Sequence, residues 1–145
     1  MNWRVANQTR RVAVQVDLAN HRDFVLAKYG ALSLDKVRRA RVPAFVDAGK
    51  TYVVLPGRLA EQLGVRAHGN ATVRYVDQHG AQRTVVDDLH VELFGRHGTF
   101  SAIVEPSRSD VLIGAIVLEA LDLLVDCGTQ TLQPRDPKQM ITEIG

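Results

Sequence analysis

The sequence predicts a mainly β fold with one or two short helices. Valines at every second position from Val12 to Val16 give the period-two pattern of a half-buried strand. The segments 71–88 and 89–105 each contain two alternating arms around a glycine-containing turn, which is typical of hairpins. Turn residues also recur too closely for alternating βαβ units. We therefore expect about eight or nine strands in a single domain over residues 1–145.

The first strand is followed by residues 20–36, a longer connection whose shape the sequence leaves open. Residues 37–47 form the next predicted strand, because a basic half in solvent leads into an apolar half in the core. Pro43 indicates a sheet edge or a bulge within it. Thr51–Leu55 is again strand-like, and residues 56–64 indicate a short helix opened by a proline and closed by a glycine.

The second half of the chain is expected to contain the two hairpins, with turns at Asp77–Gly80 and Gly95–Gly98. Residues 109–126 then predict an apolar strand, a glycine, a short helix and a further strand. Alternating apolar residues in 140–145 indicate a terminal strand. We expect two acidic side chains near the short helix to be solvated, Glu119 and Asp122.

Composition and charge exclude several classes of protein. The chain is 46% hydrophobic and 23% charged, as is ordinary for a globular protein. A single cysteine, Cys127, cannot form an internal disulfide, so we expect a reduced, cytoplasmic location. The N-terminal residues lack an apolar run long enough for a signal peptide or a membrane span, and we expect no membrane association. A net charge of +2, spread along the chain, does not indicate a nucleic-acid partner.

No cofactor or metal site is expected, because the five histidines do not have the spacing of metal ligands. Cys127 lacks the surroundings that activate a nucleophilic thiol, so we interpret it as structural. The basic run at residues 36–42 could contact phosphates, but it lacks interleaved aromatic residues and leads into an apolar strand. We interpret this run as the solvated face of a strand.

Residues 44–56 allow two interpretations. Gly49-Lys50-Thr51 matches the end of a phosphate-binding loop, but that loop needs a glycine where Ala44 stands and a helix where Thr51 enters a strand. The alternative is a tight turn, Asp47-Ala48-Gly49, that presents a carboxylate at the end of a buried strand. An aspartate in such a turn also readily bonds its own backbone and then needs no catalytic role.

The order of the motifs resembles that of the retropepsin-like aspartic peptidases, especially their small prokaryotic branch. Asp47-Ala48-Gly49 follows an apolar strand, and a short helix, hairpins and the apolar element Leu112-Ile113-Gly114 follow in turn. The resemblance extends from residue 4 to residue 134. It implies an acid-protease β-barrel that supplies half an active site per chain, with Asp47 as the catalytic residue. It also implies that Leu112, Ile113 and Gly114 pack beneath Asp47.

The same resemblance implies a homodimer in which two Asp47 carboxylates meet, share one proton and activate a water against an extended peptide or protein substrate. Ala48, Gly49 and Lys50 would then contact the substrate. His79 and Gly80 would belong to a mobile flap, although a plain surface hairpin is an equal interpretation.

Two residues depart from the pattern of that family. Ala48 replaces a threonine whose hydroxyl bonds across the dimer axis, and Lys50 replaces a small residue. If Lys50 faces the carboxylate pair, its charge opposes the shared proton, whereas it is harmless if it faces solvent. These departures leave a second hypothesis, an inactive dimeric module that binds peptides on the same fold. A basic β-domain that binds nucleic acid is the third.

Overall fold

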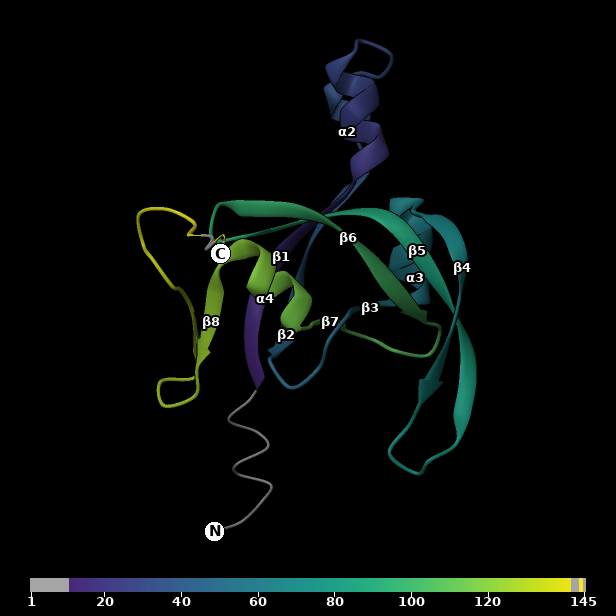
Figure 1. Cartoon of the computed structure of the whole chain (residues 1–145). Helices are drawn as coiled ribbons and strands as arrows, with labels where there is room; N and C mark the ends of the chain where they lie inside the picture. Colours follow the sequence, from purple (N-terminus) through teal and green to yellow (C-terminus); the bar gives the residue numbers. More distant parts are fainter. Residues whose placement is uncertain (1–10, 142–143, 145) are drawn as a thin grey trace.

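The computed structural model describes residues 11–141 and 144, and six of its strands close into a barrel. They are, in the order of their pairing around the barrel, β1 (Arg11–Asn20), β2 (Arg39–Asp47), β7 (Val111–Ile113), β3 (Val53–Pro56), β6 (Arg96–Glu105) and β5 (Gly80–Leu93). The pairing of β1 with β5 closes the barrel. A seventh strand, β4 (Arg66–Arg74), pairs only with β5. Figure 1 shows the β4–β5 hairpin extending from one side of the barrel.

The β5 strand changes partner part-way along its length. Its first half pairs with β4 as far as Asp87, and its second half pairs with β1 from Leu89 onward. Between them Asp88 has a left-handed backbone with a φ of 60°, and the register with β6 shifts there. A bulge of this kind bends a strand and increases its twist. The first half of β5 therefore leaves the barrel together with β4.

Three α-helices and a second small sheet complete the described part of the chain. The helices are α2 (His21–Lys28), α3 (Gly57–Leu63) and α4 (Ala115–Leu121), and a 3-10 turn covers Leu34–Lys36. The second sheet pairs β8 (Leu123–Asp126) with β9 (Thr131–Pro134). Gly64 ends α3 with a φ of 64°, the left-handed cap that its position predicts.

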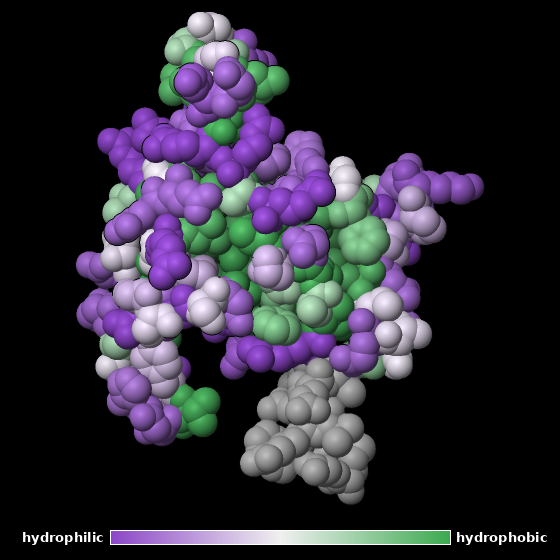
Figure 2. Space-filling view, turned by 180° about the vertical axis from the view of Figure 1, so that it is seen from behind, coloured by the Kyte–Doolittle hydropathy of each residue, from purple (hydrophilic) through white to green (hydrophobic). Residues whose placement is uncertain are grey.

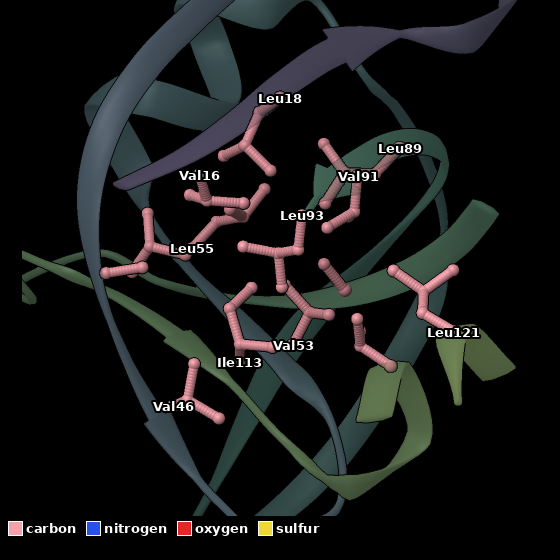
Figure 3. Close-up of a cluster of buried hydrophobic side chains, with 14 of the residues drawn as sticks. Val16, Leu18, Val46, Val53, Leu55, Leu89, Val91, Leu93, Ile113 and Leu121 are labelled. Carbon is pink, nitrogen blue, oxygen red and sulfur yellow. The ribbon is translucent and has the colours of Figure 1, made fainter. Parts of the chain in front are cut away.

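The barrel interior is filled by branched aliphatic side chains. Figure 3 shows residues from β1, β2, β3, β5, β7 and α4 pointing toward one another, among them Val16, Leu18, Val46, Leu55 and Ile113. All five are at most 1% exposed. The alternation that predicted the first strand therefore corresponds to its inward face, with Val12 and Val16 buried. On the rear of the molecule, an apolar area is bordered by polar side chains (Figure 2).

Several predicted boundaries need correction. The strand predicted at Thr51–Leu55 begins at Val53. The second hairpin turns at Phe94 and Gly95, whose φ values of 54° and 69° indicate a type I′ turn, so β6 already begins at Arg96. Met140, Ile141 and Ile144 are not in a strand, and residues 142, 143 and 145 of the predicted terminal strand lie outside the described residues. Pro43 precedes the part of β2 that pairs with β7, so it occupies an edge as predicted.

The sequence left the shape of the connection at residues 20–36 undefined. It holds α2 and the 3-10 turn, and it projects from the barrel as an arm (Figure 1). The sequence of α2 lacks the apolar stripe by which a helix is usually predicted. Its apolar residues Val25, Leu26 and Tyr29 are exposed and do not face a core. The prediction of a solvated Asp122 is wrong, because that residue is only 5% exposed, whereas Glu119 is exposed.

Buried polar side chains fasten the arm to the barrel. Asn20 accepts a hydrogen bond from the Asp23 backbone at the start of α2 and donates to the carbonyls of Leu63 (2.9 Å) and Gly64 (3.2 Å). The Asp23 carboxylate accepts three bonds from Arg38, at 2.9 to 3.0 Å. The hydrogen bonds from the Arg38 side chain lower the pKa of Asp23 below its ordinary value of 3.8.

We predict that Asp23→Ala lowers the free energy of unfolding by about 1–2 kcal/mol at neutral pH, because it leaves the Arg38 donors without their acceptor. Since the folded state lowers the pKa of Asp23, this contribution is present above pH 3.8 and is lost as the pH falls through the lowered value. Urea unfolding from acidic to neutral pH measures it. The exposed Asp35→Ala in the same arm is the control, and an equal loss in both variants would contradict the prediction.

Candidate active site

Asp47 is the last residue of β2 and is buried, with 8% of its surface exposed. Its Oδ1 accepts a hydrogen bond from the Gly49 amide at 2.9 Å, and its carbonyl accepts one from the Lys50 amide at 3.1 Å. These bonds fix a tight turn in which the carboxylate bonds its own backbone. One carboxylate oxygen, Oδ2, takes no part in that turn.

The loop after Asp47 is supported from below by β7. That strand runs parallel to β2, with Val46 beside Ile113, and antiparallel to β3, with Val54 beside Leu112. Residues 48–52, which connect β2 to β3, therefore cross over the end of β7. The Ala115 amide donates to the Lys50 carbonyl at 2.7 Å, and the Ile116 amide donates to the Thr51 carbonyl at 3.0 Å.

Gly114 is the closest point between this support and the loop. A Cβ at this position would lie 2.5 Å from the carbonyl carbon of Thr51 and 2.5 Å from the carbonyl oxygen of Tyr52. Backbone atoms cannot move away as a flexible side chain can, so only glycine fits this approach. The structure thus brings Leu112, Ile113 and Gly114 together with the Asp47 turn.

The chain contains a second Asp-x-Gly triplet whose carboxylate also bonds the glycine amide, but it lacks this support. Oδ1 of Asp126 accepts hydrogen bonds from the amides of Gly128 (2.9 Å) and Thr129 (3.2 Å). This triplet lies in the connection between β8 and β9, and Cys127 within it is exposed. What distinguishes Asp47 is therefore its burial and the strand beneath its loop, rather than the turn itself.

Arg11 lies beside Asp47 and was missed by the sequence analysis. The two residues face each other in the β1–β2 register, with Arg11 Nε 3.7 Å from Asp47 Oδ2. The guanidinium also lies over the Phe45 ring, 5.3 Å from its centroid. The Arg11 side chain is 47% exposed, so solvent weakens this attraction. The only signal that could have identified the pair is the strand register, which local sequence does not fix.

Ala48, Gly49 and Lys50 are exposed in the single chain. Ala48 borders a groove that contains both apolar and charged side chains, including Leu118, Leu124 and Ile141. Asp122 lies in the same groove, where it forms an ion pair with Arg135 at 2.9 Å and accepts a hydrogen bond from the Ile141 amide at 2.9 Å. These bonds provide the buried Asp122 carboxylate with partners.

A cleft of about 370 Å³ lies where the β4–β5 hairpin continues from β6 of the barrel. It is lined by Tyr52 at the end of the Asp47 loop, by Ala71, Thr72 and Val85 of the hairpin, and by residues 101–103 of β6. His79 and Gly80 are exposed at the hairpin tip and do not line this cleft. The structure therefore joins the Asp47 loop to the hairpin through Tyr52.

The remaining candidates from the sequence take no part in this arrangement. In the basic run, Arg38 pairs with Asp23 and Arg41 with Asp17, so two of its charges are neutralised within the chain. Within residues 11–141 and 144, no group of three or more histidine, cysteine or acidic side chains could hold a metal ion. In the same part of the chain, none of the helices has the length and apolarity needed to span a membrane.

His90 lies in the middle of a small aromatic cluster. Its ring contacts the Phe24 ring edge-on, with 5.0 Å between centroids, and lies 5.3 Å from the His97 ring. Burial lowers the pKa of His90, and the neighbouring His97 lowers it further. Phe24 of this cluster lies on α2, and none of its three rings lines the cleft.

Comparison with solved structures identifies an EIAV protease, complexed with the inhibitor HBY-793, as a structural neighbour. The two chains superpose with a TM-score of 0.55 and are 14% identical, over 77% of this chain and 88% of the other. No family model matches the sequence, and no curated protein matches it either. The mainly β fold with a closed barrel is thus retropepsin-like, as the sequence predicted.

We predict that Gly114→Ala destabilises the protein by about 3 kcal/mol, because its methyl group overlaps the Thr51 and Tyr52 backbone. Denaturant unfolding of the variant measures the loss. Gly69→Ala is the matched control, since a Cβ at Gly69 meets nothing within 4 Å. A loss for Gly114→Ala no larger than that for Gly69→Ala would show that the loop tolerates displacement.

Proposed function

We propose that this chain is one half of a homodimeric aspartic endopeptidase to which each copy contributes Asp47. The observation that carries the proposal is the position of Asp47. A buried carboxylate ends a barrel strand, its loop is fixed above Gly114, and the same loop reaches a cleft beneath a hairpin. The retropepsin-like fold agrees with this assignment, and the neighbour of that fold is itself a protease.

The proposed chemistry needs two carboxylates in one site. Two such groups about 3 Å apart cannot both be ionised, so the pair holds one proton between them. The ionised carboxylate removes a proton from a water molecule as that water attacks the peptide carbonyl carbon. The protonated carboxylate donates a hydrogen bond to the carbonyl oxygen, where negative charge develops. A single chain cannot supply the pair, because its other Asp-x-Gly triplet lies in a separate sheet.

The surface around Ala48 supports a second copy as the partner. The groove next to Ala48 includes Leu124, which is 38% exposed, and Ile141, which is 42% exposed. Contact between two such surfaces would remove apolar area from water and bring the two Asp47 turns together. The proposal thus uses one two-fold interface both for stability and for assembly of the site.

An extended peptide is the substrate class that fits the cleft. Strand edges and a hairpin can hold an extended chain by backbone hydrogen bonds, while side-chain pockets provide specificity. The cleft is lined mainly by apolar side chains, including Val85, Ala102 and Ile103. We therefore expect substrates with an apolar side chain at the cleavage site.

A dimeric peptide-binding module without catalysis is the second candidate. The absence of a hydroxyl at Ala48 and the two cations near the turn, Arg11 and Lys50, favour it. Positive charge near the carboxylate pair favours two ionised groups over one shared proton. The binding cleft would be the same in both candidates, so cleavage is the property that separates them.

The decisive test is cleavage of a peptide library from acidic to neutral pH. We expect wild type to cut and Asp47→Asn to lose at least about 1,000-fold in kcat/KM, because an amide cannot act as the base. Asp126→Asn is the matched control and should cut like wild type, since that turn lies away from the cleft. Binding of peptides without cleavage by wild type would favour the binding module, and equal cleavage by Asp47→Asn would place the catalytic carboxylate elsewhere.

A second prediction tests the interface. Ala48→Thr should tighten dimerisation by about 1–3 kcal/mol, because it restores two symmetry-related hydroxyl bonds across the axis. Sedimentation over about 1–50 µM protein measures the association constant. Ala31→Thr adds the same group to the exposed arm and should leave association unchanged. A wild-type protein that stays monomeric over that range, or equal affinities for both variants, would contradict the proposed interface.

A further inference from the structure

Glu105, the last residue of β6, joins the two strands of the β4–β5 hairpin to the barrel. Its Oε2 accepts a hydrogen bond from the Tyr75 hydroxyl at 2.6 Å, and its Oε1 pairs with the Arg83 guanidinium. Tyr75 directly follows β4, whereas Arg83 lies on β5. The Arg83 guanidinium also lies over the Tyr75 ring, 5.7 Å from its centroid. We call these three mutually contacting residues the clasp.

The clasp attaches the end of the β4–β5 hairpin to the barrel through side chains. Pairing between β5 and β6 begins at Val85 and Ile103, so residues 75–84 lie beyond that ladder. Within the described residues, the other side-chain hydrogen bonds of this segment stay inside the hairpin, such as Arg74 to the Gln78 carbonyl and Gln82 to Thr72. Only those to Glu105 reach the barrel.

The clasp lies at one end of the cleft beneath the hairpin. Ile103 and Val85 line that cleft, and Glu105 and Arg83 are the next residues on the same faces of their strands. The Glu105 side chain is 16% exposed and that of Arg83 is 28% exposed, so both are largely enclosed. The distance between the hairpin and β6 at this end is therefore set by contacts among these three side chains.

We propose that Glu105 is a positioning residue, which holds the β4–β5 hairpin at a fixed height above the cleft through Tyr75 and Arg83. The consequence for function rests on the proposed peptidase or peptide-binding activity. A peptide in the cleft would meet a hairpin that is already ordered, and less conformational entropy would be lost on binding. The role of the clasp in holding the hairpin does not depend on that activity.

The electrostatics of the clasp favour its persistence over a wide range of pH. Partial burial raises the pKa of Glu105, but hydrogen bonds from Tyr75 and Arg83, together with the charges of Arg83 and Arg108, outweigh burial and lower it. The hydrogen bond to Glu105 raises the pKa of Tyr75. The clasp is thus lost only when the pH falls through the lowered value of Glu105, or rises through the raised value of Tyr75.

Hydrogen exchange of the full chain tests the clasp directly. We expect amides in residues 75–83 to exchange about tenfold faster in Glu105→Ala than in wild type, while barrel amides remain protected. Tyr75→Phe keeps the ring and removes only the hydroxyl, so a smaller acceleration confined to the same segment is expected. Glu61→Ala, on the exposed face of α3, is the control and should leave this segment unchanged. Wild-type exchange rates at residues 75–83 in both clasp variants would overturn the proposal.

Peptide cleavage or binding supplies the functional test. We expect Glu105→Ala and Tyr75→Phe to raise KM, or Kd for a non-cleaving protein, by about five- to tenfold with kcat within about twofold of wild type. In wild type the same rise should appear when the pH falls through the lowered pKa of Glu105, and Glu105→Ala should lack this step. A loss of kcat without a change in KM would contradict a positioning role. Absence of both cleavage and binding in all variants would count against the proposed function, and hydrogen exchange would still decide the clasp.

Discussion

The close approach of Gly114 to the backbone of Thr51 and Tyr52 is the constraint on which the candidate site depends. It allows β7 to lie between β2 and β3, so the loop that joins those two strands must cross over the end of β7. Amides at the start of α4 then bond the loop carbonyls that face them. Asp47 is held at a strand end mainly by backbone contacts, to which the exposed Arg11 side chain adds one ion pair.

The partner change of β5 provides the other half of the site. Because Asp88 adopts a left-handed backbone, one strand belongs to the barrel beyond this point and to the hairpin before it. Barrel closure and the cleft are therefore properties of the same strand. The stabilising contacts of β5 are uneven. From Val85 onward the strand pairs with β6 and contributes side chains to the core, whereas residues 80–84 depend on their pairing with β4 and on the clasp.

Local sequence predicted the elements whose causes are local. Strand alternation, the two hairpins and the glycine that ends α3 follow from side-chain period and turn chemistry. The arm helix did not, because its exposed apolar residues hide the usual period. Arg11 next to Asp47 depends on strand register, and Tyr75 next to Glu105 joins residues 30 positions apart. Such contacts arise only when the barrel has closed, so no local pattern contains them.

The two Asp-x-Gly triplets show why a motif alone could not identify the site. Both aspartates accept a bond from the glycine amide at 2.9 Å, so the triplet makes the same side-chain bond in both places. At Asp47 the next residues are held above β7 and lead to the cleft, whereas at Asp126 they join two strands of a small exposed sheet. The triplet specifies a turn, and its position in the barrel decides whether the carboxylate can meet a second one. The order of elements along the whole chain was therefore more informative than the three letters, because that order determines which strand lies beneath each turn.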